Sequence, residues 1–114
     1  MKAKHDPPKN IRATRRYREL ERALLDNLAA RGLVDQAYTD KVREYMDLWV
    51  MRQELVRDVQ ERGPRVYNEK YGEQENRSVS LVIQVSRQML AIYNALGYKE
   101  PQGTGAAATV DDEL

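Results

Sequence analysis

The sequence predicts an all-α protein, a three-helix domain with one long central helix. Three glycines, Gly32, Gly63 and Gly97, each follow a run in which apolar residues recur at steps of three and four. That spacing places the apolar residues on one face of a helix. Glycine is common just after a helix because it readily adopts the left-handed conformation that ends the helix. The three glycines therefore mark the ends of three helices.

The first helix is expected to begin near Thr14 and to end at Gly32. Its apolar face consists of Tyr17, Leu20, Leu24 and Leu28. With Gly32 in the left-handed position, Leu33 stands where a Schellman motif places an apolar contact back onto Leu28. We therefore expect a defined C-terminal end for this helix.

The second helix is expected to be the long one, running from a cap at Asp35 or Thr39 to about Arg62. One stripe of this helix is apolar: Val42, Tyr45, Trp49, Val56 and Val59. Further apolar residues lie off that stripe: Met46, Leu48, Val50, Met51 and Leu55. A helix with so wide an apolar surface packs against neighbours on two sides. Trp49 lies on the stripe, which predicts that it is a core residue.

Residues 64–76 are compatible either with a short two-stranded β-ribbon or with an ordered loop. Ser78 is then expected to cap a third helix. This helix ends at Gly97, with Tyr98 placed to pack on Tyr93 in a second Schellman motif. Like the second helix, it carries apolar residues on more than one side.

The apolar surface on the second and third helices exceeds what one neighbour covers, which predicts self-association. A chain of 114 residues builds only a modest core, so stability is expected to be shared with further copies. The expected interface residues of this homo-oligomer are Met46, Val50, Met51, Leu55, Ile83 and Leu90.

The net charge of +1 hides a strong asymmetry along the chain. The first 18 residues hold seven lysines and arginines against one acidic residue, whereas residues 111–113 are all acidic. We divide the chain accordingly into a mobile basic arm (residues 1–13), a helical oligomerisation and DNA-binding domain (14–98) and a flexible acidic tail (99–114). A basic and an acidic end predict two different partners.

The basic cluster points to DNA, because each phosphate that a base neutralises releases counterions. The candidate DNA-binding residues are Lys9, Arg12, Arg15, Arg16, Arg18 and Arg22. On a helix, Arg15, Arg18 and Arg22 share one face. The alternative is that these arginines only solubilise the terminus or pair with Glu19 and Asp26.

The residue inventory predicts a protein that is not an enzyme and holds no cofactor or metal. The chain has no cysteine, and its single histidine, His5, lies in a proline-rich leader where nothing would orient it as a base. One histidine without cysteine makes no transition-metal site unless several carboxylates converge on it. No apolar stretch approaches the length of a membrane span, so no membrane partner is expected, and we expect an intracellular protein.

The order of these elements forms a wider pattern over about residues 15–101. Its parts are Tyr17-Arg18-Glu19-Leu20 with Arg31-Gly32-Leu33-Val34, the long helix with Tyr45 and Trp49, Gly63-Pro64-Arg65-Val66-Tyr67 with Gly72 and Asn76, and Leu90-Ala91-Ile92-Tyr93-Asn94-Ala95-Leu96-Gly97-Tyr98 with Pro101. This pattern of helices and glycines resembles the short type of small terminase subunit from tailed phages.

The resemblance implies a non-catalytic component of the DNA-packaging motor, working in the host cytoplasm. Such a subunit binds double-stranded phage DNA near the packaging site, assembles as a ring of identical subunits and regulates the large terminase subunit. The acidic tail is then the expected contact with the large subunit, through Asp111, Asp112, Glu113 and Leu114.

Two other classes of protein remain open. A small helical DNA-binding regulator would share the basic arm, although no short helix-turn-helix with a polar recognition helix is evident. A structural virion or adaptor protein would share the helices and the self-association. A ring of identical subunits would favour the terminase hypothesis over both.

Overall fold

The computed structural model describes residues 10–98. They form a 3₁₀ turn (Ile11–Ala13), helices α1 (Arg15–Ala30) and α2 (Gln36–Arg62), strands β1 (Arg65–Asn68) and β2 (Gly72–Glu75), and helix α3 (Arg77–Ala95). The described chain is mostly helical with one small antiparallel sheet, which confirms the predicted helical class. Of the two alternatives for residues 64–76, the ribbon forms rather than the loop.

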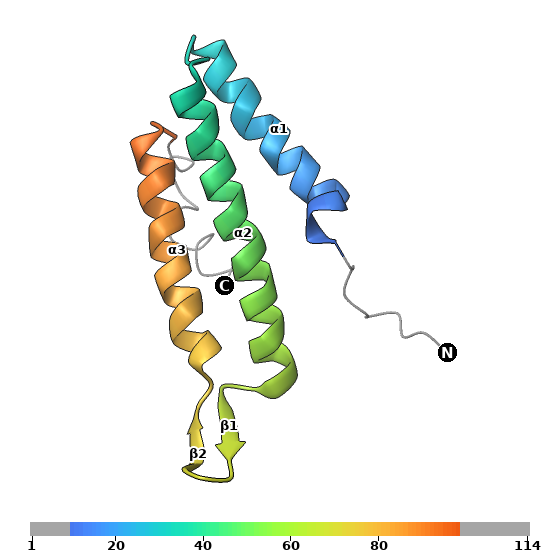
Figure 1. The fold of residues 1–114 in the computed structure, drawn as a ribbon. Coiled ribbons are helices and arrows are strands. Elements are labelled where there is room, and N and C mark those ends of the chain that lie inside the picture. The colour runs from blue at the N-terminus through green and yellow to red at the C-terminus, as the bar shows by residue number, and fades with distance from the viewer. Residues whose placement is uncertain (1–9, 99–114) are drawn as a thin grey trace, which may run out of the picture.

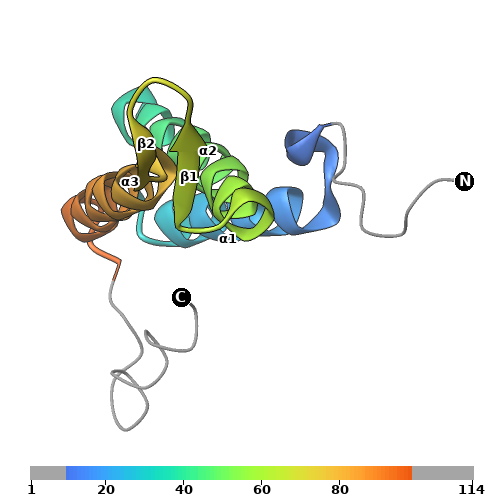
Figure 2. The ribbon, with the colours of Figure 1, turned by 90° about the horizontal axis from the view of Figure 1, so that it is seen from below.

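The helices α2 and α3 form a long antiparallel hairpin, and the ribbon projects beyond the ends that it joins (Figure 1). The shorter helix α1 packs along the half of α2 that lies far from the ribbon (Figure 1). Seen from the ribbon end, α1 and α3 lie on different sides of α2 (Figure 2). Helix α1 therefore does not cover the half of the hairpin that lies next to the ribbon.

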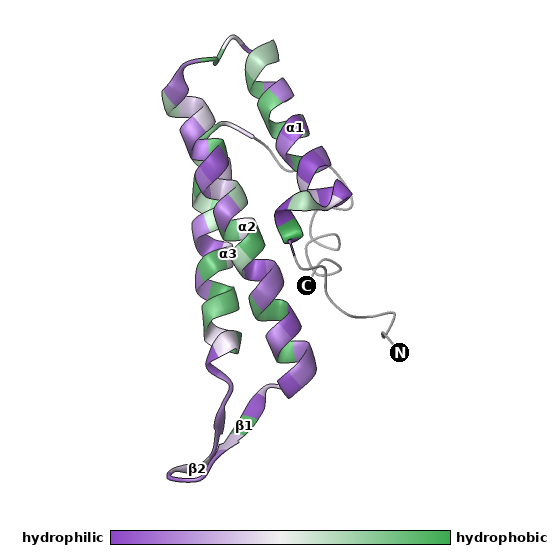
Figure 3. Cartoon of the chain, turned by 45° about the vertical axis from the view of Figure 1, so that its right-hand side comes forward, coloured by the Kyte–Doolittle hydropathy of each residue, from purple (hydrophilic) through white to green (hydrophobic). Residues whose placement is uncertain are grey.

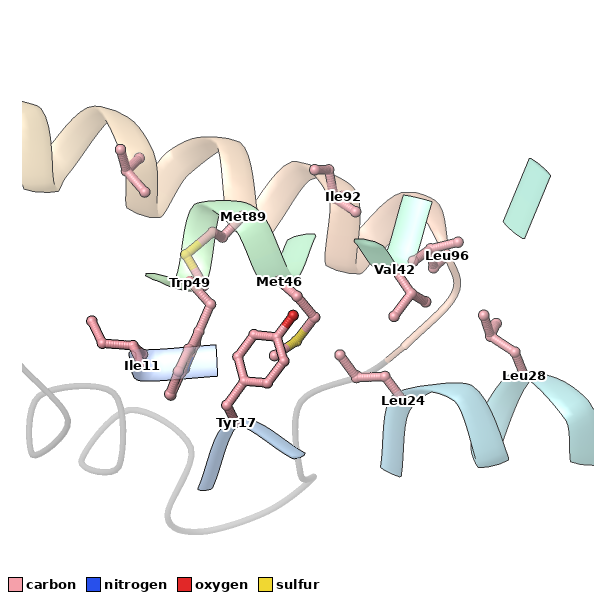
Figure 4. Close-up of a cluster of buried hydrophobic side chains, with 11 residues drawn as sticks. Ile11, Tyr17, Leu24, Leu28, Val42, Met46, Trp49, Met89, Ile92 and Leu96 are labelled. Carbon is pink, nitrogen blue, oxygen red and sulfur yellow. The ribbon is translucent and has the colours of Figure 1, made fainter. Parts of the chain in front are cut away.

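The core lies between α1 and the α2–α3 hairpin (Figure 4). Its buried apolar residues are Ile11, Tyr17, Leu24, Leu28, Val42, Met46, Trp49, Val85, Met89, Ile92 and Leu96. The rings of Tyr17 and Trp49 meet in a tilted arrangement with centroids 5.9 Å apart, which joins α1 to α2. The prediction that Trp49 is a core residue is confirmed.

Two residues that were expected outside the core belong to it. Met46 was expected at a subunit interface, but its side chain is 0% exposed within a single chain. It lies four residues after Val42 and three before Trp49, so it shares their face of α2. Ile11 was expected in a mobile arm, yet it is buried, because the 3₁₀ turn directs it onto the core. The packed part of the chain therefore begins before the expected boundary at residue 13.

Both predicted Schellman motifs are present. After α1, the amide of Leu33 donates to the carbonyl of Leu28 (2.9 Å), with Gly32 at φ 78°. After α3, the amide of Tyr98 donates to the carbonyl of Tyr93 (3.2 Å), and the two rings pack with centroids 5.0 Å apart. The local spacing of glycine and apolar residues was sufficient to predict these ends.

The beginning of α3 differs from the prediction. Asn76, not Ser78, occupies the N-cap position, and its side-chain oxygen accepts a hydrogen bond from the Ser78 amide (3.0 Å). Ser78 lies inside the helix, where its hydroxyl donates to Asp58 of α2 (2.7 Å). At α2, Asp35 has the N-cap position without a side-chain hydrogen bond to the helix.

The C-terminal end of α3 is fastened to α1. The Tyr98 hydroxyl donates to the carbonyl of Leu24 at 2.5 Å, and a guanidinium nitrogen of Arg31 donates to the carbonyl of Leu96 at 2.8 Å. The Arg31 guanidinium also lies over the Tyr98 ring, 5.3 Å from its centroid. We call these three contacts the Arg31–Tyr98 clasp.

Candidate nucleic-acid and subunit interfaces

Helix α1 presents a basic surface to solvent. The side chains of Arg15, Arg16, Arg18 and Arg22 all reach solvent. Arg15 is paired with Glu19 through a 2.8 Å contact one helical turn away. Within residues 10–98, no ion pair involves Arg16, Arg18 or Arg22, which we call the free arginines of α1. Their charge is therefore available to a negatively charged ligand.

The positions of the free arginines around α1 keep them away from the core. Tyr17, Leu24 and Leu28 are the buried residues of α1, and they share one face. Arg18 and Arg22 lie four residues apart on a different side, and Arg16 projects from a third direction. The basic surface thus wraps around the outer part of α1, at the side of the molecule away from α2.

Arg12, a candidate DNA-binding residue, is used in packing. A guanidinium nitrogen lies 2.9 Å from a carboxylate oxygen of Asp47 on α2, and another donates to the Tyr17 hydroxyl at 3.2 Å. The pKa of Arg12 is raised, mainly by its hydrogen bond to Asp47. Its charge is therefore largely offset by Asp47. Lys9, another candidate, lies outside the described residues.

A second candidate surface lies on the α2–α3 hairpin. The Arg52 side chain donates to the Ser86 hydroxyl (2.8 Å), which joins the two helices. Ile83 and Leu90, three residues before and four after Ser86, lie on its side of α3 and are 49% and 48% exposed. Met51 is adjacent to Arg52 and is 47% exposed. We call Met51, Leu55, Ile83 and Leu90 the apolar face of the hairpin.

Of the six residues expected at a subunit interface, Met51, Ile83 and Leu90 are exposed and Leu55 is half-buried. Leu55 lies three residues after Arg52 and is half-buried, because it packs against the core from the edge of the apolar face. Val50 is also half-buried, but it lies four residues after Met46 and so on the side of α2 that faces the core. The prediction is wrong for Met46, because the sequence alone does not specify which apolar stripe α1 covers.

The apolar face points away from α1, the helix that carries the free arginines. Trp49 contacts Tyr17 of α1, and Met51 follows two residues later, about 200° further around the helix. The apolar face therefore points away from α1. The hydropathy of α2 and α3 shows apolar positions along the hairpin, whereas the outer part of α1 is strongly polar (Figure 3). A ligand on α1 would leave the apolar face accessible.

A polar cluster joins α2, the ribbon and α3, and no motif in the sequence indicates it. Arg62 donates to both carboxylate oxygens of Asp58 (2.7 and 2.9 Å). Asn76 and Ser78 donate to the same carboxylate from the start of α3 (3.1 and 2.7 Å). The hydrogen bond from Arg62 has the largest effect on the pKa of Asp58. Together these hydrogen bonds hold that pKa well below its ordinary value. The cluster fixes the point from which the ribbon projects.

The ribbon itself is polar with two exposed aromatic residues. Its register pairs Arg65 with Glu75 and Asn68 with Gly72, and an ion pair of 3.3 Å links Arg65 to Glu73. Tyr67 and Tyr71 are exposed by 75% and 64%. The charges of the ribbon are mixed in sign, so it is not a second basic surface.

Neither a metal-binding cluster nor a membrane-spanning helix is found among residues 10–98. They contain no group of three histidine, cysteine, aspartate or glutamate residues that could hold a metal ion. In the same part of the chain, none of the helices combines the length and the apolar character that crossing a membrane requires. The expected large-subunit contact, residues 111–114, lies outside the described part. Comparisons with protein-family models, curated proteins and solved structures found no significant match.

Proposed function

We propose that this chain is a terminase small subunit, a non-catalytic protein that recognises DNA and regulates the large terminase subunit during phage genome packaging. Copies of the chain associate through the apolar face of the hairpin into a ring. The free arginines of α1 bind the phosphates of double-stranded DNA, and the acidic tail contacts the large subunit. The long helix α2 is the central element that carries both α1 and α3.

One observation carries the proposal: the apolar face of the hairpin points away from α1, the helix that carries the free arginines. Apolar side chains exposed to about half their area, gathered from two helices, are typical of a surface that associates with protein. Unpaired arginines on one helix are typical of phosphate binding. The separation of the two surfaces allows a chain to assemble and to bind DNA at the same time.

The decisive experiment measures assembly and DNA binding on the same samples. Size-exclusion chromatography with light scattering gives the mass of the parent protein and of Ile83→Glu with Leu90→Glu. An unpaired charge buried at an interface is strongly unfavourable, so we expect the double variant to dissociate while keeping its helicity. Val34→Glu is the matched control, because Val34 is 66% exposed but lies in the α1–α2 loop, away from the apolar face.

The outcome separates the alternatives. An oligomer that binds a labelled duplex through α1 supports the packaging role. A stable monomer that binds the duplex favours a small helical DNA-binding regulator. An oligomer without affinity for DNA favours a structural virion or adaptor protein.

A further inference from the structure

The chain leaves the described domain directly beside α1. The Tyr98 hydroxyl is bonded to the carbonyl of Leu24, and Arg31 is bonded to the carbonyl of Leu96. The Arg31–Tyr98 clasp therefore fixes the starting point of residues 99–114 against the helix that carries the free arginines. Any contact between those residues and α1 starts from a tethered position.

The charges of the two parts are complementary. Arg16, Arg18 and Arg22 have no acidic partner within residues 10–98, and Glu19 is already paired with Arg15. Asp26 follows Arg22 by one helical turn, but the two form no ion pair. Residues 111–113, Asp-Asp-Glu, form the densest acidic run of the sequence. Arg18 and Arg22, which share one side of α1, are thus matched by an acidic run on a linked segment.

The length of the linking segment matches the distance that it has to cover. From Leu24 to Arg16 is eight residues, about 12 Å along the helix axis, and the path around a helix of about 10 Å diameter adds a similar distance. Residues 99–110 are twelve residues rich in glycine, alanine and threonine. A flexible chain of that length has a root-mean-square extent of about 20 Å. A linker whose extent matches the span gives the highest effective concentration of the tethered group.

We propose that residues 111–113 occupy Arg18 and Arg22 of α1 when no DNA is bound, so that the acidic tail is an internal competitor of DNA. This inference rests on the proposed function for the identity of the competing ligand. The competition is weak, because each exposed ion pair adds little to the free energy of the contact. A DNA duplex therefore displaces the tail. A partner that captures the tail frees the basic surface of α1.

The contact is tested without DNA, so its result is independent of the proposed function. The chain has no cysteine, so Thr109→Cys provides a single site for a nitroxide spin label. We expect the label to broaden the amide signals of residues 15–22 in low salt and to stop doing so in about 0.5 M salt, where screening acts over a few ångströms. The matched control carries the same label with Asp111→Asn, Asp112→Asn and Glu113→Gln, and we expect no selective broadening.

A second measurement tests the competition itself. The variant with neutralised residues 111–113 should bind a labelled DNA duplex about two- to five-fold more tightly than the parent in low salt, and equally in high salt. Broadening that is absent from α1, or that persists in the neutralised control, overturns the proposal. A further sample mixes ¹⁵N-labelled chains that carry no spin label with unlabelled chains that do. Broadening that arises only between such chains also overturns the proposal, because the contact would then lie between molecules. Failure of all variants to bind DNA contradicts the proposed function and leaves the spin-label result standing.

Discussion

Asn76 and Asp58 lie eighteen residues apart in the chain, yet the Asn76 side-chain amide donates a hydrogen bond to the Asp58 carboxylate over 3.1 Å. Asn76 is fully buried. Its amide also donates to the carbonyl of Gly63 (2.9 Å), and its oxygen accepts from the Ser78 amide (3.0 Å). One side chain therefore joins the end of α2 to the start of α3.

Replacing Asn76 with alanine should lower the free energy of unfolding by about 2 kcal/mol, because its partly buried partners lose their hydrogen bonds and α3 loses its cap. Urea unfolding followed by circular dichroism measures the change. Asn94→Ala is the control: Asn94 is exposed on α3, so we expect a change of less than about 0.5 kcal/mol. Equal effects of the two substitutions would mean that the polar cluster contributes nothing to stability.

Asp58 should make stability depend on pH in the acid range. Its pKa in the folded protein lies well below the ordinary value of 3.8, so the unfolded chain binds more protons around and below that pH. The stabilising effect of the carboxylate is therefore complete above about pH 5 and is lost as the pH falls towards the folded pKa. The difference in unfolding free energy between the parent and Asp58→Asn should be constant from about pH 5 to 7 and shrink below about pH 4. A difference that stays constant down to about pH 2 would contradict this assignment.

Gly97→Ala should cost more than Gly32→Ala, although both glycines end a helix at positive φ (81° and 78°). The strain of a left-handed alanine, about 1 kcal/mol, is common to both variants. At Gly97 the added methyl group would lie 2.8 Å from a guanidinium nitrogen of Arg31, whereas nothing lies within 4 Å at Gly32. The guanidinium of Arg31 must shift, which weakens its bond to Leu96 and adds up to about 1 kcal/mol. In an Arg31→Ala background the two variants should be equally stable; a persistent gap would point to a cause other than Arg31.

The free arginines of α1 should set the salt dependence of DNA binding. Arg16→Gln, Arg18→Gln and Arg22→Gln together should reduce the slope of log affinity against log salt by roughly 0.9 for each phosphate that is no longer neutralised. A salt titration with two duplexes of different sequence should show the same reduction for both, because phosphate contacts do not read sequence. Arg87→Gln, an exposed arginine on α3, is the control. An unchanged slope in the triple variant, with a reduced slope in the control, would place the DNA site on α3.

Helix ends could be predicted from the sequence because their causes are local. Gly97 and Tyr98 act within five residues of Tyr93, and the contact follows from helix geometry alone. The cap of α3 could not be predicted in this way, since Asn76 and Ser78 are both good capping residues. Asp58, twenty residues before Ser78, binds the Ser78 hydroxyl and leaves Asn76 as the cap.

The exposure of the candidate residues was predicted only in part, because burial depends on how the helices pack. Charge and spacing were sufficient to place Arg16, Arg18 and Arg22 on a solvent-facing helix surface, as the structure has them. They did not reveal that Arg12 pairs with Asp47, because that contact depends on how α1 crosses α2. Likewise Met46 and Met51 are equally apolar in the sequence. Only the position of α1 decides that Met46 is buried and Met51 is exposed.

The Arg31–Tyr98 clasp bears on the order in which the chain folds. The bond from Tyr98 to Leu24 spans 74 residues, whereas the bond from Ser78 to Asp58 spans 20. Closing the longer loop costs more chain entropy, so the hairpin of α2 and α3 should form first and the clasp should close after the transition state. Breaking the clasp would then accelerate unfolding and leave the refolding rate nearly unchanged. Stopped-flow measurements on Tyr98→Phe would follow both rates, and a slower refolding limb would place the clasp in the folding nucleus instead.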